Sequence, residues 1–101
     1  MENFRVYALF DTIKSNIRYI GYSSKPLSVR MGQHISMCSF RDSRKNEWLL
    51  DAIESERPIG IVELAKFSTS EEALEYEKKM IEVYSKTHSL TNSSTRILGF
   101  D

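Results

Sequence analysis

Residues 17–34 read Ile-Arg-Tyr-Ile-Gly-Tyr-Ser-Ser-Lys-Pro-Leu-Ser-Val-Arg-Met-Gly-Gln-His, and we expect this stretch to decide the fold. Its first six residues alternate as a strand does, which predicts Ile17, Tyr19 and Gly21 on one face. Glycine at the end of a strand lets backbone or a ligand come close. The proline then suits the first turn of a helix, on which Arg30 and His34 share one face. This polar cluster beside an apolar element indicates a function beyond stability.

The composition is that of a small globular protein. With 101 residues, 41% of them apolar and 28% charged, the chain predicts one domain over residues 1–101. No apolar run approaches the roughly 20 residues needed to cross a bilayer, and no basic-then-apolar leader opens the chain. A single cysteine, Cys38, cannot form an internal disulfide. We therefore expect a cytoplasmic protein with no membrane segment.

Charge is balanced overall but not along the chain. The formal net charge is zero, which argues against a protein surrounded by a general basic field. Residues 1–34 carry five lysines and arginines against two acidic residues, whereas residues 35–101 carry nine against twelve. A nucleic-acid ligand is therefore expected to meet the first third of the chain locally.

Periodicity predicts an α+β domain with the element order β-β-α-α-β-α. Strands are expected at 4–10, 17–22 and 59–67, and helices at about 26–38, 45–56 and 70–86. The first two strands are expected to form a hairpin that can bring Tyr7 and Tyr19 together on one face, and the third strand pairs with this hairpin. In the tail that follows Thr87, docking is expected only for Asn92 and residues 97–100, and His88 is interpreted as a histidine at a helix end.

Each helix has an apolar stripe that predicts its buried side. The expected members of the three stripes are Leu27, Met31, Ile35 and Cys38; Trp48, Leu49, Ala52 and Ile53; and Ala73, Leu74, Met80, Ile81 and Tyr84. Glu77 falls inside the last stripe, because it lies four residues from both Ala73 and Ile81. An ionised carboxylate in an apolar core is costly, so Glu77 should meet a cation, a strong donor or water. A structural pair with a buried arginine is the alternative.

With these positions marked, the chain resembles the GIY-YIG nuclease superfamily over nearly its whole length. Tyr19-Ile20-Gly21 matches the second half of the signature literally, and Arg5-Val6-Tyr7 keeps only the tyrosine of the first half. The remaining matches, in chain order, are Arg30, His34, Glu77 and Asn92. Tyr22 stands where many members have a basic residue after the second glycine, and this departure argues against any lysine-assisted activation of Tyr7.

The resemblance implies a small three-stranded antiparallel sheet flanked by helices, and metal-dependent hydrolysis of phosphodiesters. It implies Tyr7 as general base, with His34 accepting its hydrogen bond, because a phenol with a pKa of about 10 needs such help near neutrality. Tyr19 would position water or phosphate. Arg30 would grip the phosphate, and Glu77 would hold one Mg²⁺ or Mn²⁺. The late asparagine, Asn92, would order the site.

The expected partner is nucleic acid, with DNA as the leading substrate. The residues expected to contact it are Gly21, Lys25, Arg30, Arg41, Arg44 and Lys45. The alternative is a module or inhibitor that keeps the fold and binds nucleic acid or protein without cutting. Neutral charge favours weak binding, a partner subunit or a homo-oligomer.

Overall fold

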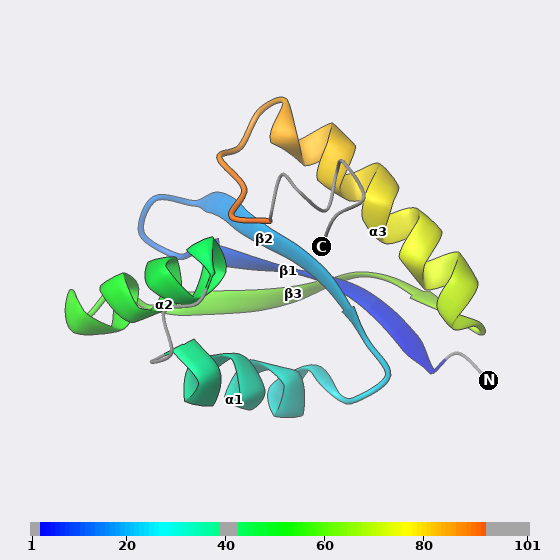
Figure 1. Cartoon of the computed structure of the whole chain (residues 1–101), viewed down its shortest axis with the longest axis horizontal. Helices are drawn as coiled ribbons and strands as arrows, with labels where there is room; N and C mark the ends of the chain where they lie inside the picture. Colours follow the sequence, from blue (N-terminus) through cyan, green and yellow to red (C-terminus); the bar gives the residue numbers. More distant parts are fainter. Residues whose placement is uncertain (1–2, 39–42, 93–101) are drawn as a thin grey trace.

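A computed structural model describes residues 3–38 and 43–92 of the chain, and it has the predicted α+β architecture (Figure 1). The elements are β1 (Phe4–Asp11), β2 (Asn16–Ser23), α1 (Leu27–Met37), α2 (Arg44–Glu54), β3 (Ile59–Phe67) and α3 (Ser70–Ser85). The strands form one antiparallel sheet in the order β2-β1-β3. None of the described helices is long and apolar enough to cross a membrane. Arg41 and the expected docking of residues 97–100 lie outside the described residues.

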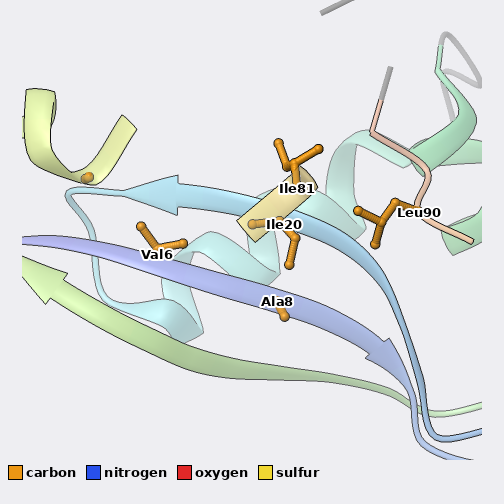
Figure 2. Close-up of a cluster of buried hydrophobic side chains, with 6 residues drawn as sticks. Val6, Ala8, Ile20, Ile81 and Leu90 are labelled. Carbon is orange, nitrogen blue, oxygen red and sulfur yellow. The ribbon is translucent and has the colours of Figure 1, made fainter. Parts of the chain in front are cut away.

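The central strand β1 divides the core into two parts, because its side chains alternate between the faces of the sheet. Figure 1 shows α3 on one side of the sheet and α1 on the other. Val6 and Ala8 pack with Ile20 against the α3 side, and Ile81 and Leu90 cover them (Figure 2). On the other face, Tyr7 and Leu9 pack against buried residues that include Cys38, Trp48 and Leu49.

A bulge in β2 overturns one part of the predicted alternation. Leu9 pairs with Tyr19, but the next residue, Phe10, pairs with Ile17, so Arg18 is an extra residue in the ladder. Ile17 therefore packs with the α3-side core, whereas Tyr19 packs with the opposite one. The prediction that Ile17 and Tyr19 share a face was wrong for this reason.

Three residues of the predicted apolar stripes are exposed. Ile35, Ile53 and Leu74 have 38%, 42% and 37% of their surface accessible. In α1 the buried position is taken by His34, which is 1% exposed. Each of these apolar residues was assigned to the buried side of its helix from spacing alone, and an apolar residue at the border of such a stripe can remain exposed.

The helices α2 and α3 both begin at a capping side chain. Thr69 accepts a hydrogen bond from the backbone N–H of Glu72 at 3.2 Å and so caps α3. Ser43 accepts from the backbone N–H of Asn46 at 3.1 Å. Because Ser43 is the cap, α2 begins at Arg44, and Lys45 lies in its first turn.

Residues 86–92, which follow α3, form a returning segment along the outer edge of β2, as the orange trace in Figure 1 shows. The Ile17 backbone N–H donates to His88 Nδ1 at 3.1 Å, and Thr91 Oγ1 donates to the Arg18 carbonyl at 2.7 Å. Asn92 Oδ1 accepts from the Ile20 N–H at 3.0 Å, and its Nδ2 donates to the Ile20 carbonyl at 2.8 Å. These contacts satisfy backbone groups of an edge strand. His88 therefore lies beyond the end of α3 and has a docking contact that the sequence did not predict.

Candidate active site

The candidate site is centred on the hydroxyl of Tyr7, which the alternation of β1 directs to the face covered by α1 and α2. Tyr7 is fully buried. Its Oη lies 2.6 Å from His34 Nε2 and accepts a hydrogen bond from Arg30 Nε at 3.2 Å. Arg30 and His34 reach the same oxygen because they are one helical turn apart on α1. The structure thus brings these three predicted residues into direct contact.

Gly21 makes room for this arrangement. It pairs with Tyr7 across the β1–β2 ladder. A Cβ at Gly21 would lie 2.6 Å from Tyr7 Oη and 2.8 Å from Tyr19 Cε2, which are distances that real Cβ atoms do not show. The centroids of the two tyrosine rings are 6.4 Å apart. The close approach predicted at this glycine is therefore the approach of the two tyrosine side chains.

The surroundings of Tyr7 disfavour the ionised phenolate, which is the form that a general base needs. Burial raises the pKa of Tyr7 well above its ordinary value, and the charge of Tyr19 raises it further, whereas Arg30 lowers it. In the chain alone, burial outweighs the favourable contact with the guanidinium. The phenol is therefore neutral at neutral pH in this state, and the role of Tyr7 as a base stays a prediction.

His34 is neutral as well. The pKa of His34 is lowered to about 3, chiefly by burial and also by the positive charges of Lys45 and Arg30. Lys45 Nζ lies 2.9 Å from His34 Nδ1 and 5.5 Å from the centroid of the Tyr19 ring. The Tyr19 ring also meets the imidazole edge-on, with centroids 5.5 Å apart. The sequence indicated Lys45 only as a cation that could meet nucleic acid, and it did not reveal this contact with His34.

Glu77 is buried in the apolar stripe of α3, as predicted, with 5% of its surface exposed. Its charge is one of the causes that raise the pKa of Tyr7, so the carboxylate belongs to the electrostatic surroundings of the phenol. Among residues 3–38 and 43–92, no three His, Cys, Asp or Glu side chains gather as a metal cluster. A single carboxylate fits Mg²⁺ or Mn²⁺, because such ions keep several waters and bind substrate phosphates as well.

The other predicted residues lie in several places. Asn92 holds both backbone groups of Ile20, so it orders β2 beside the site. Arg44 Nη2 donates to the Leu90 carbonyl at 3.0 Å and thereby anchors the same returning segment. Lys25 is exposed in the turn that precedes α1.

The chain matches a known protein family over most of its length. The family model described as the GIY-YIG catalytic domain matches residues 3–91 of the 101-residue chain. Neither the curated proteins nor the solved structures gave a match. The matched region contains Tyr7, Tyr19, Arg30 and Glu77, all in the positions described above. Because the match covers most of the chain, this protein belongs to the GIY-YIG family, whose members are in general nucleases that act on nucleic acid with a divalent metal.

Proposed function

We propose that this protein is an endonuclease that hydrolyses phosphodiester bonds in DNA with the help of Mg²⁺ or Mn²⁺. One observation carries the proposal: a buried tyrosine hydroxyl, that of Tyr7, contacts Arg30 Nε at 3.2 Å and His34 Nε2 at 2.6 Å. A buried phenol whose pKa is shifted, with a guanidinium and an imidazole at its oxygen, has the character of a group at a functional site.

In the proposed reaction, a water oxygen attacks phosphorus and the bond to the leaving oxygen breaks. Tyr7, once its own proton has passed to solvent, acts as the phenolate base that takes a proton from this water, and the leaving oxygen takes a proton from solvent. Arg30 stabilises both the phenolate and the phosphate charge. Tyr19 lies beside Tyr7, with the ring centroids 6.4 Å apart, and is proposed to position the water or the phosphate. The raised pKa of Tyr7 in the chain alone means that positive charge must be added before the phenolate forms near neutral pH.

Glu77 is the residue proposed to hold the metal. When bound, a divalent cation supplies positive charge that stabilises the negative charge of the transition state. The carboxylate is suited to this role because it is buried and its charge already influences Tyr7. Water and the substrate phosphate complete the coordination of such an ion.

The test is incubation of the full chain with supercoiled plasmid and with single- and double-stranded oligonucleotides, each in Mg²⁺, Mn²⁺ or EDTA. We expect cleavage that depends on the metal. Tyr7→Phe and Glu77→Gln should each reduce the rate by about 100-fold or more, because each change removes a group from the chemistry and keeps its size.

Two matched variants serve as controls. Tyr22→Phe makes the same change on the α3 side of the sheet, and Glu75→Gln makes it at an exposed position of α3. Both should cut as the unmodified protein does, and circular dichroism should show that all four variants are folded. Undiminished cleavage by Glu77→Gln would contradict the metal role. A folded protein that binds the oligonucleotides but cuts none of them would instead support the binding module.

A further inference from the structure

Lys45 occupies a position that local helix energetics disfavour. It lies in the first turn of α2, directly after Arg44. The positive end of the helix dipole is at this terminus, so cations here are unfavourable and acidic residues are preferred. Lys45 also directs its ammonium inward, since Nζ lies 2.9 Å from His34 Nδ1 and over the ring of Tyr19. A lysine kept in an unfavourable local position and hydrogen-bonded to a buried imidazole indicates a role in the site.

The contact decides which nitrogen of His34 carries the proton. An ammonium has three N–H donors and no acceptor, so His34 Nδ1 must present its lone pair to Lys45. In a neutral imidazole the proton is then on Nε2. We propose that Lys45 is a positioning residue that holds His34 in the Nε2–H tautomer, so that the imidazole donates its hydrogen bond to Tyr7 Oη.

This assignment reverses the expected direction of the bond between Tyr7 and His34. A phenol oxygen accepts two hydrogen bonds and donates one. Arg30 Nε–H and His34 Nε2–H fill both acceptor positions of Tyr7 Oη. The hydrogen of Tyr7 therefore points away from His34, and both donors already face the oxygen when it becomes a phenolate. In the proposed nuclease, Lys45 thus acts on the base through the imidazole.

The inference rests on the proposed function only for its effect on rate, and the tautomer can be measured without it. Long-range ¹H–¹⁵N correlation spectra of the imidazole side chains at pH 7 distinguish protonated Nε2 from protonated Nδ1. The chain has two histidines, and His88→Gln identifies which signals belong to His34. In the Lys45 variants His88 is an internal reference, because its Nδ1 accepts from the Ile17 N–H and this contact is not changed.

Three variants test the role of the ammonium. In Lys45→Met, which keeps the length and removes the donor, His34 should leave the pure Nε2–H form and cleavage should fall by about 10- to 100-fold. Lys45→Arg keeps a side chain that can only donate hydrogen bonds, so His34 should retain its Nε2–H tautomer and the variant should keep most of the cleavage rate. Lys79→Met removes a lysine from an exposed position of α3 and should change neither signal nor rate.

Two results would overturn the proposal. One is a wild-type His34 with its proton on Nδ1, and the other is an unchanged Nε2–H signal in folded Lys45→Met. A protein that cuts no substrate but whose His34 tautomer responds to Lys45→Met would disprove the nuclease function and leave the positioning role in place. Normal cleavage by a Lys45→Met variant with an altered tautomer would show that the rate does not depend on this contact.

Discussion

Gly21 shows how closely single residues are fitted around the tyrosine hydroxyl. The side chains of Tyr7 and Tyr19 occupy the space that a Cβ at Gly21 would need. The glycine of the Tyr-Ile-Gly triplet is therefore explained by steric fit between neighbouring strands, with no need of an unusual backbone angle. Contact with nucleic acid at Gly21 stays a prediction.

We predict that Gly21→Ala disrupts the site, because its Cβ would lie 2.6 Å from Tyr7 Oη. Overpacking of this kind should lower the free energy of unfolding by about 1–3 kcal/mol, and the displaced phenol should reduce cleavage by about 10-fold or more. Urea denaturation and the plasmid assay measure the two effects.

Gly32→Ala is the matched control for this change. Nothing lies within 4 Å of a Cβ at Gly32, which is on the exposed side of α1. Alanine should raise the stability of the helix by about 0.5–1 kcal/mol. If Gly21→Ala behaved in the same way, the tight fit around Tyr7 would be wrong.

The edge strand β2 is held in place by residues that lie about 70 positions later in the sequence. Asn92 binds both the N–H and the C=O of Ile20, the residue before Gly21. An asparagine side chain can replace a neighbouring strand because its amide offers one acceptor and two donors, as a peptide group offers one of each. The returning segment thus closes the edge and supports the strand that carries Tyr19.

We predict that Asn92→Ala loosens β2. Two buried backbone groups of Ile20 would lose their partners, which should cost about 1–3 kcal/mol. Hydrogen exchange of the Ile20 amide should accelerate in proportion to this loss. Ser89→Ala is the control, because Ser89 contributes only its carbonyl, as the acceptor from Arg18 Nε. An Ile20 amide that stays fully protected in Asn92→Ala would show that other contacts hold the edge.

For the whole molecule, the buried imidazole links stability to pH. The folded pKa of His34 is about 3, compared with 6.5 for a free histidine. The unfolded chain therefore binds a proton that the folded chain excludes, so this contribution is fully present above pH 6.5 and is lost as the pH falls towards 3.

We predict that the unmodified protein loses about 2 kcal/mol of stability through His34 between pH 7 and pH 5. His34→Gln should lack this part of the loss, whatever its stability at pH 7. Urea denaturation of both proteins at the two pH values gives the comparison, and the other titrating groups are shared. Equal losses in the two proteins would mean that His34 is protonated as easily in the folded state as in the unfolded one.

Much of the fold could be predicted because it depends on patterns within single elements. Alternation in β1 placed Tyr7 on one face and Val6 on the other, and the one-turn spacing placed Arg30 beside His34 on α1. The stripe of α3 also predicted the burial of Glu77. In each case the relevant neighbours are a few residues apart, so the period of the strand or helix is enough.

Contacts between elements were decided only by the tertiary structure. The bulge at Arg18 moved Ile17 to the other core, because strand register depends on both partners. Lys45 meets His34 across two helices, and this contact sets the hydrogen bond to Tyr7. The sequence by itself therefore placed Tyr7 on one face of β1 and Arg30 beside His34 on α1, whereas the packing of α2 on α1 brought Lys45 to His34 and decided the direction of the hydrogen bonds. The physical reason is that a proton's position depends on every partner around it, and those partners come from separate parts of the chain.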